Sequence, residues 1–198
     1  MTLDAGFYDV PAGHVATIVT HLEMREKPAS RPDFATGLSL KAMPNPEADW
    51  YRSLFRRVGG EDWLWFSRLA LPQVELHRVI TAPQTRIWAA QQDGQDVGLL
   101  ELDFSDPQAC ELAFFGLAPE TIGTGAGRWL MNQALDLAWS EPISRLHLHT
   151  CTLDHPAALD FYRRSGFVAT KRQVEIAPDP RLNDILPEQA APHIPILR

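Results

Sequence analysis

Residues 120–139, ETIGTGAGRWLMNQALDLAW, place three glycines within five positions directly before a helical pattern. The preceding segment, CELAFFGL at 110–117, has the apolar character of a buried strand. A strand, a glycine turn and a helix leave backbone N–H groups at the positive end of a helix dipole, which favours an anion. Because glycines have no side chain, a phosphate can approach this main chain closely. We therefore expect residues 123–128 to bind a phosphate group.

Two familiar phosphate-binding loops do not match this turn. The order G-x-G-x-G at 123–127 differs from the dinucleotide fingerprint G-x-G-x-x-G, and the sequence contains no G-x-x-x-x-G-K-[ST] loop. A glycine-rich turn by itself is equally compatible with a purely structural role. Other residues therefore have to identify the ligand.

The rest of the chain alternates strand-like and helix-like segments. Strands are predicted at 14–24, 85–92, 96–104, 110–117, 144–151 and 167–176. Helices are predicted from Trp50 to Val58, where Gly59-Gly60 ends the pattern, from Pro72 to Ile80, from the glycine turn up to Pro142, and at 155–166. This order predicts a single mixed α/β domain over residues 1–198, with a proline-containing extended tail at 178–198.

The net charge of −7 argues against protein classes that need a cationic face. We expect no binding to nucleic acid or to a membrane, whereas a cationic substrate such as an amine is compatible with this charge. The sequence shows no leader pattern and no apolar stretch long enough to span a bilayer, so a cytoplasmic location is expected. Cys110 and Cys151 are too few for a disulfide framework and are interpreted as reduced thiols.

A second motif helps to identify the ligand of the glycine turn. The segment LDHPAALDFYRRSGF at 153–167 places Ala158, Phe161 and Tyr162 on one helical face before a Gly-Phe stop. Together with PETIGTGAGRWLM at 119–131, it resembles the GNAT superfamily of acyl-CoA-dependent N-acyltransferases. Two positions depart from the family pattern: Ile122 replaces the usual Gln or Arg, and His155 replaces the usual Asn.

The resemblance implies both a fold and a co-substrate. The fold would be an α/β structure with a mixed, mostly antiparallel central sheet, splayed at its fourth and fifth strands, with helices on both faces. The co-substrate would be acetyl-CoA, whose acetyl group an amine attacks directly, and no metal is expected. The residues implied to bind it are Phe115, Gly116, Leu117, Ile122, Gly123, Thr124, Gly125, Ala126, Gly127, Arg128, His155, Ala158 and Tyr162.

The resemblance also implies three catalytic roles. Glu111 matches the general base of one branch of the family, and desolvation on an apolar strand is expected to raise its pKa. The N–H of Phe115 would stabilise the oxyanion beside a break in strand pairing at Gly116. The Tyr162 hydroxyl would protonate the departing thiolate. A solvated Glu111, an ordinary β-bulge and a core tyrosine are the respective alternatives.

Three residues with metal-binding side chains share one face of a predicted strand: His147, His149 and Cys151, with His155 nearby. A zinc site is therefore an alternative, although no second ligand pair with typical spacing accompanies them. Contacts on the substrate side of the cleft or with neighbouring loops are the preferred interpretation.

Aromatic residues cluster between positions 50 and 66. Trp50 and Phe55 lie at helical spacing, as does Tyr51, and we expect Trp50 and Phe55 to pack in the core. Trp63 and Trp65, which lie near two acidic residues, are candidates for contact with a cationic acceptor.

These patterns together predict an acetyl-CoA-dependent N-acetyltransferase that acts on a small-molecule or peptide amine, with a homodimer left open. Two other classes remain as alternatives. One is a non-catalytic acyl-CoA-binding sensor or interaction module, and the other is a metal-dependent hydrolase that uses the histidine strand.

Overall fold

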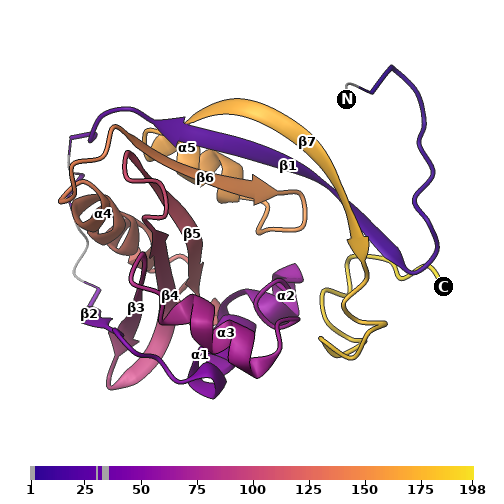
Figure 1. Cartoon of the computed structure of the whole chain (residues 1–198), viewed down its shortest axis with the longest axis horizontal. Helices are drawn as coiled ribbons and strands as arrows, with labels where there is room; N and C mark the ends of the chain where they lie inside the picture. Colours follow the sequence, from indigo (N-terminus) through magenta and orange to yellow (C-terminus); the bar gives the residue numbers. More distant parts are fainter. Residues whose placement is uncertain (1–2, 30, 33–35) are drawn as a thin grey trace.

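The described residues form one seven-stranded sheet with helices on both faces (Figure 1). The structure is a computed structural model that describes residues 3–29, 31–32 and 36–198. The strands are β1 His14–Met24, β2 Ser39–Ala42, β3 Thr85–Gln92, β4 Gln95–Asp103, β5 Ala109–Leu117, β6 Arg145–Cys151 and β7 Val168–Pro178. Their spatial order is β2-β3-β4-β5-β6-β1-β7, and only the β5–β6 pair is parallel. The predicted mixed, mostly antiparallel sheet is confirmed.

The two faces of the sheet carry different helices and separate apolar clusters. The α-helices are α1 Ala48–Phe55, α2 Glu61–Trp63, α3 Gln73–Ile80, α4 Ala126–Ala138 and α5 Ala158–Arg164, with a π-helix η1 at Arg56–Gly60 and a 3-10 helix η2 at Pro119–Thr121. Cys110 and Leu112 on β5 pack in the cluster that contains α4, whereas Phe114 packs against the cluster of α1 and α3, because the extra residue Ala113 shifts the register between Leu112 and Phe114. No helix in the described ranges is long and apolar enough to cross a membrane.

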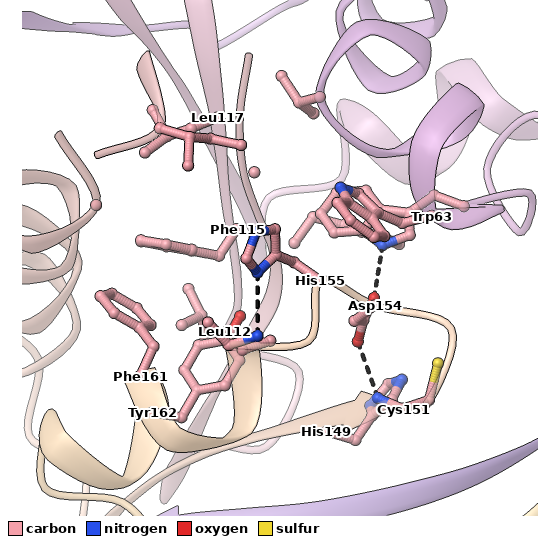
Figure 2. Close-up of a pocket in the computed structure, with 18 of the residues that line it drawn as sticks. Trp63, Leu112, Phe115, Leu117, His149, Cys151, Asp154, His155, Phe161 and Tyr162 are labelled. Carbon is pink, nitrogen blue, oxygen red and sulfur yellow. Dashed lines mark hydrogen bonds between the residues drawn. The ribbon is translucent and has the colours of Figure 1, made fainter. Parts of the chain in front are cut away.

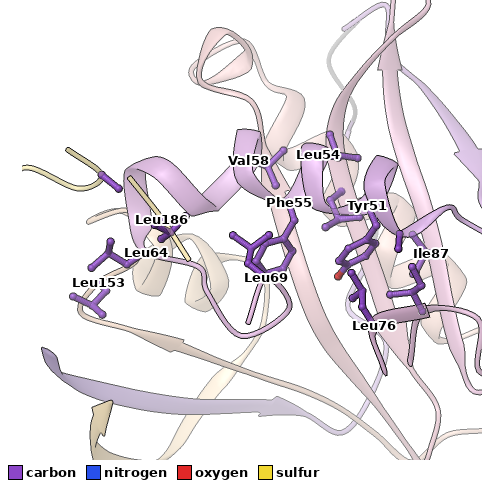
Figure 3. Close-up of a cluster of buried hydrophobic side chains, with 14 of the residues drawn as sticks. Tyr51, Leu54, Phe55, Val58, Leu64, Leu69, Leu76, Ile87, Leu153 and Leu186 are labelled. Carbon is purple, nitrogen blue, oxygen red and sulfur yellow. The ribbon is translucent and has the colours of Figure 1, made fainter. Parts of the chain in front are cut away.

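The cluster of α1 and α3 extends from the sheet to the C-terminal segment (Figure 3). Tyr51 and Phe55 from α1 and Leu76 from α3 are fully buried, and Leu186 from the C-terminal segment packs in the same cluster. Complete burial of an aliphatic or aromatic side chain of this size contributes about 1.5–3 kcal/mol. The predicted core position of Phe55 is therefore confirmed, and Trp50 is partly buried against the same cluster.

Strands β5 and β6 pair over only three positions at their N-terminal ends, Ala109–Arg145, Cys110–Leu146 and Glu111–His147. From Leu112 onward, β5 pairs only with β4. This is the splay that the sequence predicted. Gly116 lies in the part of β5 that has no β6 partner, but it stays paired with Leu99 of β4, and the irregularity of β5 lies at Ala113.

Glycine serves a different purpose at position 116. A Cβ atom there would lie 2.7 Å from Val58 Cγ2, closer than carbon atoms can approach. The missing side chain therefore lets helix η1 sit directly against β5.

The prediction that Gly59-Gly60 ends the first helix is also wrong. After α1 the chain continues as η1 and α2, and the helical segment ends at Leu64, which has a positive φ of 52°. A Cβ atom on Gly59 would lie 2.2 Å from Trp65 Cδ2. Gly59 thus makes room for the Trp65 indole instead of stopping the helix.

Two further features were not foreseen. Strand β2 is short and largely exposed, and it adds to the sheet edge beside β3. The tail is not extended beyond β7, because Asp179 and Arg181 form a buried ion pair of 2.7 Å. Arg181 also donates to the carbonyls of Ala190, Ala191 and Ile194. The tail folds back as turns that pack on α2, where the N–H of Ala191 donates to the Glu61 carbonyl at 2.7 Å.

Candidate active site

A cavity of about 400 Å³ opens where β5 and β6 diverge (Figure 2). One end is lined by the glycine turn and by α5, and the other by the segment around Trp63 and by the C-terminal end of β6. Of the residues that the sequence implied for cofactor binding, all line the cavity except Thr124, Gly125, Ala126 and Arg128. These four lie in the same turn and in the first turn of α4.

The glycine turn presents unused hydrogen-bond donors. Gly123 and Gly125 have positive φ values of 82° and 91°, which glycine adopts without strain. The N–H groups of Gly123, Gly125 and Gly127 meet no acceptor among the residues that the structure describes, whereas the N–H of Thr124 donates to the Thr121 carbonyl. Because the turn leads into the 13-residue helix α4, these donors lie at its positive end.

Positive side chains gather near this turn. Arg164 lines the cavity. The pKa of Arg31 is lowered by its partial burial and by the positive charges of Arg128 and Arg164, so both of these guanidinium groups lie near that of Arg31. Sequence reasoning did not include Arg31 or Arg164; the only signal was the Arg163-Arg164 pair at the end of the second motif.

Aromatic side chains form the wall between the glycine turn and β6. The Phe115 ring centroid lies 5.7 Å from that of Phe161 and 6.3 Å from that of Tyr162. Burial, and secondarily the negative charge of Asp154, raises the pKa of Tyr162, so its hydroxyl is protonated at neutral pH. His155 accepts the N–H of Ala157 at Nδ1 (3.0 Å), and its ring contacts Trp63 at 5.0 Å.

Glu111 does not occupy the environment that the sequence predicted. It is absent from the cavity lining, and His149 lies in the lining instead, with its Nδ1 3.5 Å from Glu111 Oε1. The expected rise in the pKa of Glu111 is wrong: the hydrogen bond with His149 outweighs desolvation and lowers it. The same contact raises the pKa of His149. The functional role assigned to Glu111 stays a prediction.

The opposite end of the cavity has an aromatic wall, to which Trp63, Trp65 and Phe66 contribute. The Trp65 indole donates to Asp154 Oδ1 at 2.9 Å. Asp154 Oδ2 accepts from the Thr150 hydroxyl and from the N–H of Cys151, at 2.6 and 2.8 Å. Asp154 therefore fastens the end of β6 to this wall and uses both oxygens in doing so.

A buried polar network supports the same wall from beneath. The Tyr51 hydroxyl and the Arg68 guanidinium both donate to Glu101, which is completely buried on β4. Arg68 also lies over the Phe114 ring, with its Cζ 5.1 Å from the centroid. Glu101 pairs with Phe114 next to the irregularity in β5. The network thus joins the segment before α3 to the splayed strand, and no sequence motif indicated it.

Strand β6, which carries the histidines, has two unlike faces as predicted, but its His and Cys side chains do not all reach the cavity. His149 and Cys151 line the cavity, whereas His147 does not. Within the described part of the chain, no group of three His, Cys, Asp or Glu residues is placed to hold a metal ion. Cys110 and Cys151 are both free thiols.

A model of the acetyltransferase (GNAT) family matches residues 46–167, which is more than half of the chain. The protein belongs to the GNAT family. No curated protein sequence matches the chain.

Solved structures that resemble this GNAT protein share its fold at low sequence identity. A GCN5-related N-acetyltransferase from Sphaerobacter thermophilus gives a TM-score of 0.59 at 12% identity, over 90% of this chain and 54% of that chain. A putative GNAT-family acetyltransferase from Novosphingobium aromaticivorans gives a TM-score of 0.56 at 14% identity, over 84% of this chain and 67% of that chain. A spermidine/spermine N-acetyltransferase from Vibrio cholerae, solved with manganese ions, gives a TM-score of 0.53 at 19% identity, over 75% of this chain and 96% of that chain. This GNAT chain spans about half the length of the first of these structures.

Membership of the GNAT family implies an acyl-CoA co-substrate, and the residues present fit one. Backbone donors with no acceptor in the described protein suit a diphosphate, which offers several acceptor oxygens. Neighbouring guanidinium groups complement its negative charge. The apolar wall of Phe115, Leu117 and Phe161 suits an uncharged arm that extends toward the splay.

Proposed function

We propose that this protein is an N-acetyltransferase that transfers the acetyl group of acetyl-CoA to a primary amine of a small molecule or peptide, in a ternary complex. The observation that carries the proposal is the continuity of the cavity. One opening in the sheet joins the donors of Gly123 to the side chains of His149 and Trp63. A cofactor held at the first end can therefore meet an acceptor that enters from the second.

In this proposal the chain binds acetyl-CoA mainly through its backbone. The N–H groups of the glycine turn hold the diphosphate, and Arg164 adds a favourable charge. Phe115, Leu117 and Ala158 flank the arm along the cavity. When bound, the co-substrate supplies an acetyl group activated as a thioester. The residues of the splay keep its carbonyl carbon accessible from the acceptor side.

The amine must lose its proton before or during attack, and we propose that Glu111 assists this through His149. His149 lines the cavity, whereas Glu111 contacts the Nδ1 side of its ring from outside the cavity. The carboxylate orients the imidazole and leaves Nε2 for the amine proton. Glu111 is then a positioning residue and His149 the general base.

Two groups complete the proposed reaction. The N–H of Phe115, on the part of β5 that has lost its β6 partner, stabilises the developing oxyanion. The Tyr162 hydroxyl, kept protonated by its raised pKa, donates its proton to the departing thiolate. The products are the N-acetylated amine and coenzyme A.

The first experiment tests the glycine turn with a matched pair of variants. Gly123 and Gly94 have similar φ values, 82° and 79°, and neither has a heavy atom within 4 Å of an added Cβ. Gly123→Ala and Gly94→Ala should therefore lose similar stability, about 1 kcal/mol. Only Gly123→Ala places a methyl group where the diphosphate approaches. Calorimetry with acetyl-CoA should show affinity reduced about tenfold or more for that variant alone.

Turnover is measured separately, by release of the free thiol across a panel of amines and by mass spectrometry of the product. Binding of acetyl-CoA with N-acetylated product supports the proposal. Binding without product for any amine contradicts it and favours a non-catalytic acyl-CoA-binding module. Absence of binding, or equal loss in both glycine variants, contradicts the role of the turn.

A further inference from the structure

Strand β7 lies at the edge of the sheet and pairs only with β1 (Figure 1). Nearly all of its 11 residues are exposed. Its outer edge carries backbone donors and acceptors that no other strand of the described chain uses. Long exposed edges of this kind readily pair with another strand.

The β7 edge is also apolar on one face. Val174 and Ile176 are 49% and 47% exposed, and Ile18, which lies opposite Val174 on β1, is 39% exposed. These three side chains form a contiguous group on the sheet surface. An added strand would cover the group from the side as well as satisfy the free edge.

The charged residues of β7 indicate which strand would pair with its free edge. Lys171, Arg172 and Glu175 form no ion pair with another residue in the described ranges. Lys171 and Glu175 project from the same face, since they pair with His21 and Thr17 on β1. Two opposite charges four residues apart on one strand are complementary to the same strand running in the opposite direction.

We propose that two copies of this chain associate through their β7 strands, antiparallel, around a two-fold axis that passes through Gln173. A two-fold axis perpendicular to a sheet keeps each face on its own side, so opposing residues must both be odd or both be even. With the axis at Gln173, Lys171 of each copy lies opposite Glu175 of the other. Arg172 lies opposite Val174, and the Val174 side chains of the two copies become diagonal neighbours.

Neighbouring registers lack this complementarity. An axis at residue 172 places Arg172 against its own copy, which is repulsive. An axis at Val174 places Lys171 opposite Ala177 and Glu175 opposite Gln173, so that no charges are paired directly. Charge therefore selects one register among those that symmetry allows.

The association has a consequence for the cavity. Glu175 is one of the residues that line it. In the dimer, Lys171 of the second copy meets Glu175 at the rim, so that each copy contributes a side chain to the edge of the other's cavity. The proposal does not depend on the acetyltransferase assignment, because it rests on β7 alone.

Charge reversal tests the register in the full-length protein. The wild-type protein should be a dimer by sedimentation velocity and by light scattering, without cofactor or acceptor. Lys171→Glu and Glu175→Lys each place like charges opposite each other twice, and each should weaken the dimer by about tenfold or more. The double variant restores the pairs in reverse and should recover most of the wild-type association. All of these side chains are exposed, so the substitutions should not prevent folding.

A cysteine at the axis tests the same geometry independently. Gln173→Cys faces its own copy at a Cβ separation close to that of a disulfide, and mild oxidation should link the two chains. Val74→Cys, on the exposed surface of α3, is the matched control and should not link. A monomeric wild-type protein, a dimer indifferent to both charge reversals, or efficient linkage through Val174→Cys with none through Gln173→Cys overturns the proposal.

Discussion

The two faces of the sheet carry two halves of the site, and they are built differently. On the α4 and α5 face, the glycine turn and the Tyr162 helix come from two contiguous segments, 119–131 and 153–167. On the opposite face, the apolar cluster collects residues from Val15 to Ala191, and the cavity wall depends on α2, on β6 and on the folded tail. The half proposed to bind the cofactor is thus encoded locally, and the half proposed to bind the acceptor is encoded by long-range contacts.

This difference has an energetic meaning. A backbone turn that binds diphosphate needs little beyond its own glycines and the helix that follows it. A wall assembled from distant segments needs every buried polar group in those segments to be satisfied, because an unpaired group is costly. Changes on the acceptor face should therefore affect stability first, and changes on the cofactor face should affect acetyl-CoA affinity with little effect on stability.

The largest expected effect is on stability, at the tail. Arg181→Met leaves Asp179 as a buried carboxylate without its partner and leaves three backbone carbonyls without their donor. We expect the free energy of unfolding to fall by about 3–5 kcal/mol, the usual cost of removing one member of a buried ion pair. Urea denaturation measures it. Acetyl-CoA affinity under native conditions should remain close to that of the wild type.

Arg198→Met is the control, because Arg198 pairs with Glu188 at the surface and both side chains are more than half exposed. The change in its free energy of unfolding should stay within about 1 kcal/mol.

The hydrogen bond from Arg181 holds the pKa of Asp179 below its usual range. This stabilisation is present above the unfolded pKa and is lost as pH falls through the folded one, so the difference between wild type and Arg181→Met should shrink in acid. A variant as stable as the wild type would show that the tail does not support the acceptor face.

The next largest effect is on turnover. Glu111→Gln removes the carboxylate whose hydrogen bond, together with its negative charge, raises the pKa of His149. A base with a lower pKa loses its proton at lower pH, so the acid limb of kcat/KM should move to lower pH. The rate itself should fall about hundredfold, because the imidazole is both weaker as a base and less well oriented. A pH-rate profile with one amine substrate measures both changes.

His147→Asn is the matched control for this profile. His147 lies on the same face of β6 but does not line the cavity, so its profile should stay close to that of the wild type. If the acid limb of Glu111→Gln keeps its position while the rate falls, the group that titrates on this limb is not coupled to Glu111, and the role of His149 as base is wrong. In the wild type, the His149–Glu111 pair stabilises the fold below the ordinary pKa of histidine, and this is lost as pH rises through the raised value.

The sequence predicted the half of the site that is local. The strand, the glycine turn and the helix are adjacent in the chain, so the position of Gly123 at the cavity followed from pattern alone. The splay and the cavity position of Tyr162 followed from the family resemblance, since the two motifs lie in fixed places in that fold.

The acceptor half could not be predicted because its determinants are contacts between distant residues. The sequence pattern predicts a helix stop at Gly59, but the role of this glycine depends on where the Trp65 indole lies. The burial of Arg181 depends on carbonyls 9 to 13 residues away that only the folded tail brings together. The lowered pKa of Glu111 depends on a histidine from another strand, which a strand pattern cannot place.

The smallest expected effect is on cofactor affinity and uses two adjacent arginines. Arg164 lines the cavity, whereas Arg163 lies outside it and is 3.5 Å from Asp160 on the same helix. Arg164→Gln should weaken acetyl-CoA binding about threefold at low salt, the value of one exposed charge contact, and Arg163→Gln should leave it unchanged. Because such contacts are screened, the loss in Arg164→Gln should largely disappear at high ionic strength. Calorimetry at two salt concentrations resolves this difference. Equal losses in the two variants would mean that net charge, and not a placed guanidinium, attracts the cofactor to this face.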